Sequence, residues 1–213
     1  MSIPNPDGPS GRALASLSPC QISFLQSLPK AELHAHLNGC IPLSCLQELA
    51  RQLDGSVDTL DSVKEGLAVL QAGVELDSIR DFFTLFPAIY HITSTPHAIS
   101  AATSAVLDSF LASVDGQPPQ CTYIELRTTP RETPSMSRRQ YLDAVLGEVS
   151  KREGTATLIV SIDRRMHPSV AEECAELAIL LRSQGKPVVG IDLCGDPLVR
   201  LHFFRAIRLP SLN

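Results

Sequence analysis

The stretch Leu28-Pro-Lys-Ala-Glu-Leu-His-Ala-His-Leu-Asn-Gly39 decides how the fold begins. Residues 31–36 are predicted to form a strand, because Pro29 precedes them and the turn-forming pair Asn38-Gly39 follows them. A helix is predicted after this turn, since apolar residues recur at helical spacing over residues 43–50. The sequence therefore opens with a strand–turn–helix unit.

The remainder of the chain repeats this alternation. Further strands are predicted at residues 121–128, 155–163 and 188–193. Further helices are predicted at residues 77–91, with Asp77 as N-cap, and at residues 95–111, 137–152 and 168–184. Residues 54–75 are expected to form a loop or a short helix. Strands that alternate with helices predict a parallel sheet in an α/β fold.

Polar clusters close all four predicted strands. They are His34 with His36, residues 128–131, residues 163–165, and Gly195 with Asp196. In parallel α/β folds the functional residues gather at the C-terminal ends of the strands. The pattern favours a TIM (β/α)8-type barrel, of which this chain holds only about the first four β/α units.

Composition narrows the class of protein. The 213 residues are 44% hydrophobic and 19% charged, which is a globular balance. A net charge of -5 gives no broad electrostatic reason to bind nucleic acid or an anionic membrane, so neither partner is expected. No apolar run reaches the roughly 18 to 20 residues that cross a bilayer, and the N-terminus does not resemble a secretory signal. The six scattered cysteines are expected to be reduced thiols in a cytosolic protein.

His34 and His36 are the first candidate functional residues. One residue separates them on a predicted strand, so both imidazoles project from the same face. Imidazole is a good ligand for zinc and other first-row metals. The alternative is a pair of histidines that only form hydrogen bonds in a core or loop, and the spacing alone leaves both open.

The residues around this pair resemble the opening strand of the adenosine deaminase family. That strand reads Pro-Lys-x-Glu-Leu-His-x-His-Leu, followed by a short polar residue and glycine, as Pro29 to Gly39 do here. Other amidohydrolases and metal-dependent phosphoesterases also open with His-x-His but usually lack the preceding residues. The resemblance implies a purine deaminase with one Zn2+ ion, held in part by His34 and His36.

Two further segments point to one branch of that family. Typical members have Asp, facing the ribose, where this chain has Asn38; Asn resembles the branch that removes methylamine from N6-methyl-AMP. The segment Tyr123-Ile-Glu-Leu-Arg-Thr-Thr-Pro-Arg131 resembles the same branch. A guanidinium pairs with phosphate through two donors, which favours Arg131 as the ligand of a purine nucleoside monophosphate. The alternative is that Arg131 is a solvated loop charge.

The resemblance implies a set of substrate-binding residues. They are His36, Asn38, Tyr90, Thr128, Thr129, Pro130, Arg131, Asp163 and Gly195. Asp163 resembles a substrate-contacting acid but could equally cap the turn after its strand. Gly195 matches a glycine whose backbone lies close to the purine, and it could also be a turn glycine.

The segment around residue 90 departs from the branch. The usual Ile-His-x-Leu-Thr is here Ile89-Tyr90-His91-Ile92-Thr93. Tyr90 takes the place of the histidine and could supply a hydroxyl. One position on a helix is about 100° of rotation, so His91 should face elsewhere. We expect His97 and His167 to be surface residues.

The segment Gly190-Ile-Asp-Leu-Cys-Gly-Asp196 resembles the family's Gly-Asp motif, and in the family the catalytic groups come after that motif. Zinc acidifies a water that attacks C6 of the purine, while a glutamate, a further histidine and an aspartate handle protons. Residues 200–213 form a divergent tail that resembles an alternative end, with His202 as its only histidine and no glutamate. No catalytic residue is therefore assigned, the zinc ligand set is expected to be incomplete, and the chain is expected to be inactive alone. Residues 1–18 are expected to be a flexible leader, and residues 19–199 the N-terminal half of the deaminase barrel.

Three functional hypotheses follow. The first is a zinc-dependent aminohydrolase that converts N6-methyl-AMP to IMP and methylamine in its full-length form. The second is a truncated isoform that acts as a binding or regulatory species and self-associates through open sheet edges. The third is a deaminase that acts on the nucleoside adenosine.

Overall fold

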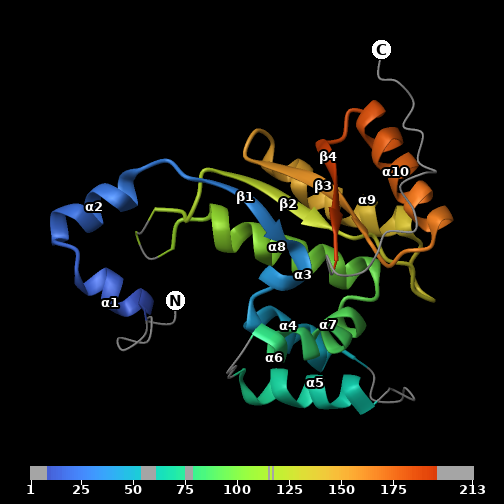
Figure 1. Cartoon of the computed structure of the whole chain (residues 1–213), viewed down its shortest axis with the longest axis horizontal. Helices are drawn as coiled ribbons and strands as arrows, with labels where there is room; N and C mark the ends of the chain where they lie inside the picture. The colour runs from blue at the N-terminus through green and yellow to red at the C-terminus, as the bar shows by residue number, and fades with distance from the viewer. Residues whose placement is uncertain (1–8, 54–60, 75–78, 115, 117, 196–213) are drawn as a thin grey trace.

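Four parallel strands form the centre of the computed structural model, which describes residues 9–53, 61–74, 79–114, 116 and 118–195. The strands are β1 (Ala31–His36), β2 (Tyr123–Thr128), β3 (Ala156–Asp163) and β4 (Val188–Cys194), in the order β1-β2-β3-β4. Each strand pairs with the next one in the sequence, as in a TIM barrel (Figure 1). The predicted α/β sheet is confirmed, and residues 196–213 lie outside the described residues.

Helices separate the strands. Before β1 come α1 (Pro9–Ala15) and α2 (Pro19–Ser27); after β1 come α3 (Leu37–Cys40), α4 (Leu43–Arg51), α5 (Asp61–Ala72), α6 (Ile79–Thr84), α7 (Phe86–Ile92) and α8 (Pro96–Leu111). Between β2 and β3 lie α9 (Arg138–Val149) and the 3-10 turn η1 (Ser150–Arg152), and α10 (Pro168–Ser183) joins β3 to β4. Helix α8 begins where the sequence predicts, because the Thr95 side chain accepts a hydrogen bond from the Ala98 N–H.

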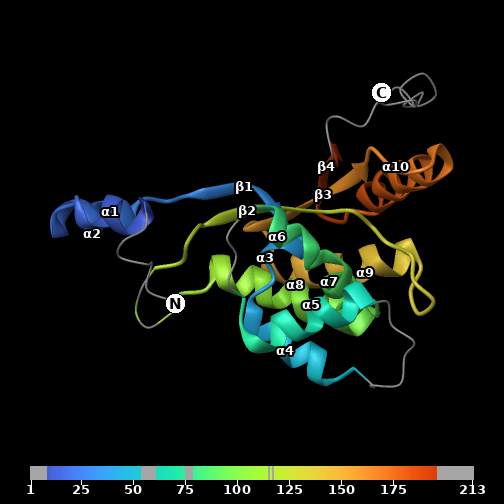
Figure 2. The same cartoon turned by 60° about the horizontal axis from the view of Figure 1, so that its bottom comes forward.

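The two faces of the sheet differ in character. One face carries fully buried apolar side chains, such as Ile124 and Leu126 of β2 and Leu158 of β3, which pack with α8, α9 and α10 into one core. Figure 2 shows α8 and α9 on one side of these strands. The opposite face carries polar groups that include His36 and Arg127, which are partners in the β1–β2 register. Side chains of opposite character alternate along the strands, as expected for strands with one apolar face.

The predicted helix over residues 77–91 is wrong in one respect. It divides into α6 and α7 at Leu85, because Pro87 has no N–H to donate to the carbonyl of Phe83. Asp77, the predicted N-cap, lies outside the described residues. Of the stretch 54–75, residues 61–72 form α5, and residues 9–15 of the expected flexible leader form α1.

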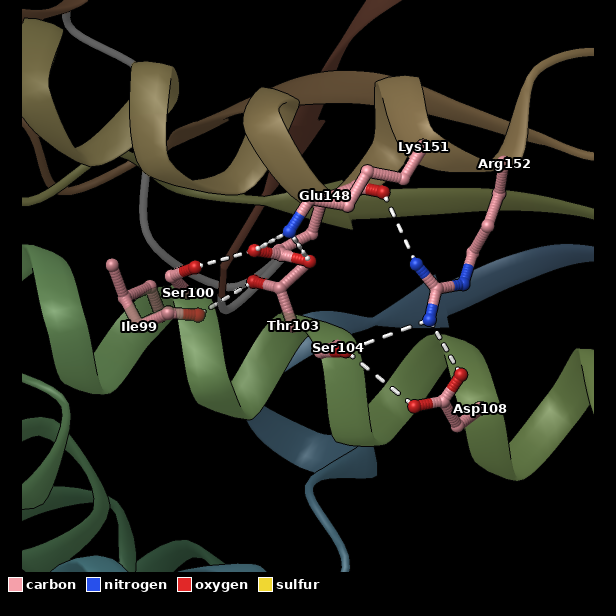
Figure 3. A network of polar contacts seen from close by, with 8 residues as sticks. All are labelled: Ile99, Ser100, Thr103, Ser104, Asp108, Glu148, Lys151 and Arg152. Carbon is pink, nitrogen blue, oxygen red and sulfur yellow. Dashed lines mark hydrogen bonds and ion pairs between the residues drawn. The ribbon is translucent and has the colours of Figure 1, made fainter.

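A polar network joins α8 to α9 and η1 (Figure 3). Ser100 Oγ donates to Glu148 Oε1 over 2.6 Å, and Lys151 Nζ donates to both carboxylate oxygens over 2.8 Å. Burial would raise the pKa of Glu148, but the hydrogen bonds from Lys151 and Ser100 leave it below its ordinary value. Arg152 also forms an ion pair with Asp108 of α8 at 2.5 Å. These contacts fix the two helices that support β2 and β3.

The structure also bears on the expected absence of a membrane-spanning segment and on the expected state of the cysteines. Among the described residues, no helix is both long enough and apolar enough to span a bilayer. All six cysteines are free; Cys121 and Cys174 are buried, whereas Cys20 is exposed.

Candidate functional site

The two histidines of β1 converge at the C-terminal end of that strand. His34 Nε2 and His36 Nε2 lie 3.3 Å apart, and the ring planes are tilted by 58°. Both side chains therefore project from the same face, as the alternation along a strand predicts. Two imidazole nitrogens at this separation suit a shared metal ion. Within the described ranges, no group of three or more His, Cys, Asp or Glu could hold a metal, so the pair offers two ligands only.

The surroundings of His36 favour its neutral form. Burial lowers the pKa of His36, and electrostatic interactions with His34 and Arg127 lower it further, while Asp192 acts in the opposite direction. A neutral imidazole has the free lone pair that a metal requires. The residues present thus fit part of a zinc site.

Asn38 lies at the start of a buried polar cluster. Its Nδ2 is 3.5 Å from the Tyr141 hydroxyl, which in turn shares a 2.6 Å hydrogen bond with Thr128 Oγ1. The side-chain oxygen of Asn38 is buried and has no hydrogen-bond partner in the structure. Such an unpaired buried acceptor is costly unless a ligand or water supplies a donor.

Tyr141 is a site residue that the sequence reasoning missed. The predicted helix over residues 137–152 includes Tyr141 without assigning it a role, and in the structure its side chain is fully buried. A signal did exist, because a buried tyrosine hydroxyl usually needs a polar partner. Here the partners are Asn38 and Thr128, two residues of the expected substrate-binding set.

Arg131 is tied to the end of α7. Its guanidinium carbon lies 4.3 Å from the centre of the Tyr90 ring and 5.5 Å from that of Tyr141. It donates to the Tyr90 carbonyl over 3.1 Å and to Thr93 Oγ1 over 2.8 Å. These contacts satisfy acceptors at a helix C-terminus, so the alternative of a freely solvated charge is wrong. Its Nε is buried and has no hydrogen-bond partner in the structure.

Tyr90 faces this cluster through its contact with Arg131. Burial raises the pKa of the Tyr90 hydroxyl, an effect that the charge of Arg131 partly offsets. His91 is the next residue of α7 and is half-buried. His97 is exposed, and His167 is exposed with its Nδ1 2.9 Å from Ser169 Oγ.

Asp163 and Gly195 meet at the ends of β3 and β4. Asp163 accepts hydrogen bonds from the backbone N–H of Arg165 over 2.8 Å and from its guanidinium over 2.7 and 2.9 Å. These bonds lower the pKa of Asp163. Gly195 has φ +95°, and a Cβ there would lie 2.8 Å from Asp163 Oδ1. The turn-capping interpretation of Asp163 is thus observed, and Gly195 is required both by its conformation and by this close approach.

Thr129 and Pro130 lie between these groups. Thr129 Oγ1 is 3.4 Å from Cys194 Sγ, which links the ends of β2 and β4 across β3, and Pro130 is buried. The expected residues therefore gather at one end of the sheet, in three neighbouring groups. These groups are the histidine pair, the cluster around Tyr141, and the Asp163–Gly195 turn.

Comparison with known proteins agrees with this arrangement. The family described as adenosine deaminase matches residues 29–206. N6-Methyl-AMP deaminase-L of Xenopus laevis is 35% identical over 185 residues, which cover 84% of this chain and 50% of that protein. The chain thus spans about half the length of the curated relatives that it matches.

Comparison with solved structures also finds N6-methyl-AMP deaminases. The apo N6-methyl-AMP deaminase from Arabidopsis thaliana has a TM-score of 0.68 and 35% identity, over 86% of this chain and 55% of that one. The structure of Arabidopsis ADAL complexed with IMP has a TM-score of 0.65 and 34% identity, over 83% of this chain and 52% of that one. Both neighbours are TIM barrels. A match that extends over most of the chain places it in the adenosine deaminase family.

Proposed function

We propose that the chain forms the part of a zinc-dependent purine aminohydrolase that carries two metal ligands and binds the phosphate of the substrate. The overall reaction is hydrolysis of N6-methyl-AMP to IMP and methylamine, with one water consumed. The observation that carries this proposal is the 3.3 Å approach of the His34 and His36 nitrogens at the C-terminal end of β1. The similarity to relatives named N6-methyl-AMP deaminase supports the choice of substrate.

The residues of this chain have distinct roles in the proposal. His34 and His36 hold the metal, and a zinc ion bound there supplies acidification of water at neutral pH. Asn38 accepts a hydrogen bond from a ribose hydroxyl, which satisfies its unpaired buried oxygen. Gly195 lets the purine approach the backbone at the end of β4, because it has no side chain in the way.

Arg131 is the residue that distinguishes a nucleotide from a nucleoside. Its Nε–H has no partner in the structure, and one N–H of its NH1 group remains after the bond to Tyr90, so the guanidinium keeps its charge and unused donors for a phosphate. Aromatic contacts with Tyr90 and Tyr141 orient the guanidinium plane. A deaminase that acts on adenosine would have no use for these donors.

A binding experiment separates the two substrates. We expect the purified chain to bind IMP more tightly than inosine in isothermal titration calorimetry. Arg131→Gln should remove about 1.5 to 3 kcal/mol of IMP binding, the range for hydrogen bonds to charged groups. It should leave inosine binding unchanged. Equal affinities for IMP and inosine in the unchanged chain would favour the nucleoside hypothesis instead.

The 213-residue chain alone is proposed to be inactive. Catalytic zinc sites use about three protein ligands, whereas the described residues bring only His34 and His36 together. The test is to incubate the chain with Zn2+ and N6-methyl-AMP and to measure methylamine. Turnover that His34→Ala abolishes would overturn the proposed inactivity.

A second candidate function is non-catalytic. Strand β4 has a single strand partner in the described part of the chain, and its residues Val189 and Ile191 are 40% and 39% exposed. An edge strand with exposed apolar side chains can pair with another chain. In this alternative the chain self-associates through its sheet edges and acts as a binding or regulatory species.

A further inference from the structure

Strand β1 contains an irregularity at the histidine pair. Its register with β2 runs Glu32 to Ile124 and then Ala35 to Leu126. Two residues of β1, Leu33 and His34, therefore oppose the single β2 residue Glu125, which is the arrangement of a β-bulge. Bulges of this kind redirect side chains and are common beside active sites.

The bulge decides which face His34 occupies. Glu32 pairs with Ile124, whose side chain lies in the core. In a regular strand His34 would share the face of Glu32, because side chains two residues apart point the same way. The extra residue shifts the alternation by one position, so that His34 and His36 both lie on the polar face of the sheet. The bulge is therefore the reason that the histidine pair lies on the polar face of the sheet and not in the core.

Two side chains form hydrogen bonds with the backbone groups that the bulge prevents from pairing with the backbone of β2. The Glu32 carboxylate accepts a hydrogen bond from the His34 N–H over 2.7 Å. The Arg127 guanidinium donates to the Leu33 carbonyl over 2.7 Å through NH2. Both backbone groups are thus satisfied by side chains rather than by the backbone of β2, which stabilises the irregular conformation.

Asp192 holds Arg127 in position. Its carboxylate forms an ion pair with Arg127 NH1, and the two side chains are only 22% and 11% exposed. The guanidinium therefore links β4 to β1 across the polar face, from its own place on β2. An arginine suits this task because its planar group can bind two acceptors in fixed directions.

We infer that Glu32, Arg127 and Asp192 are positioning residues, which hold the Leu33–His34 bulge and thereby aim His34 at the metal shared with His36. This inference rests on the proposed function, since it assumes that the histidine pair binds a metal. Glu32 and Arg127 lie in the two segments that resemble the adenosine deaminase family, and Asp192 lies in the predicted strand 188–193.

Co2+ is the probe for the test, because its visible absorption reports both binding and ligand geometry. The unchanged chain is titrated with Co2+, and His34→Ala serves as the control for the site. We expect Glu32→Ala and Arg127→Gln each to weaken Co2+ binding by about 10- to 100-fold, the range for residues that orient metal ligands. Glu32→Gln should retain most of the affinity, because its amide oxygen can still accept the His34 N–H.

A matched variant and a second measurement separate positioning from general loss of structure. Arg152→Gln breaks a comparable Arg–Asp pair between α8 and η1, far along the chain from the bulge, and should leave Co2+ binding unchanged. Amide hydrogen exchange at His34 should become faster in Glu32→Ala and stay slow in Glu32→Gln, and this measurement does not require bound metal. Far-ultraviolet circular dichroism confirms that each variant folds.

The outcomes distinguish the two proposals. If the unchanged chain and His34→Ala bind Co2+ equally, the proposed metal site is wrong, while the exchange measurement still tests the bulge. If the unchanged chain binds Co2+ through His34 but Glu32→Ala and Arg127→Gln bind it equally well, the positioning role is wrong and the metal site stands. Equal loss of affinity in Glu32→Ala and Glu32→Gln would also overturn the hydrogen-bonding role of Glu32.

Discussion

Gly195 shows how a single residue can be required at the candidate site. Its φ of +95° costs a residue with a side chain about 1 to 2 kcal/mol, and a Cβ would lie 2.8 Å from Asp163 Oδ1. Gly195→Ala should therefore reduce the free energy of unfolding by about 2 to 4 kcal/mol, measured by urea denaturation. Gly154→Ala is the control, because Gly154 has φ +76° with nothing within 4 Å. Equal losses in both variants would show that the contact with Asp163 is unimportant.

Asp163 makes stability depend on pH. Hydrogen bonds from Arg165 lower its pKa below the ordinary value of about 3.9. The ionised group therefore stabilises the fold above that ordinary value, and the stabilisation is lost as the pH falls through the lower pKa of the folded state. Arg165→Met should be less stable than the unchanged chain at pH 7, with the difference shrinking in acid.

Urea midpoints across the acid range provide the measurement. The effect should be small, because the Arg165 side chain is 69% exposed and its ion pair is screened by solvent. Arg164→Met removes a neighbouring charge without removing these hydrogen bonds. A stability difference for Arg165→Met that is the same at every pH would contradict the role assigned to Asp163.

At the scale of elements, the Ser100–Glu148 contact stabilises the packing of α8 on α9 (Figure 3). The carboxylate is mostly buried, so losing the 2.6 Å hydrogen bond leaves one of its acceptors less well satisfied. Ser100→Ala should therefore lower the free energy of unfolding by about 1 to 2 kcal/mol in thermal or urea denaturation. Ser104→Ala, whose hydroxyl is 3.4 Å from Asp108 at an exposed site, should cost less. The reverse order would exclude the Glu148 network as a stabilising contact.

At the scale of the whole molecule, the sheet edge provides the test for self-association. Lysine on an edge strand opposes pairing with another chain. If β4 mediates association, Ile191→Lys should shift the chain toward monomer in sedimentation velocity at increasing concentration. Val114→Lys is the matched control, because Val114 is 43% exposed but lies between α8 and β2 in the sequence rather than on the edge strand β4. A chain that is already monomeric at high concentration would exclude this second candidate function.

Local patterns were enough to predict the strands and most helix starts, because alternation, capping residues and proline act over a few positions. They also predicted that His34 and His36 share a face, which depends only on their spacing. The break between α6 and α7 was missed because the apolar stripe continues through Pro87. Tyr141 was missed because its partners Asn38 and Thr128 lie far away in sequence or on another element.

The sequence by itself determined the family motif, the parallel α/β class and the identity of the residues at the strand ends. Only the tertiary structure decided how those residues are held. The bulge at Leu33–His34 depends on Arg127 from β2 and Asp192 from β4, and Arg131 is directed by the end of α7. These are contacts between segments that are distant along the chain, and no periodicity within one segment records them.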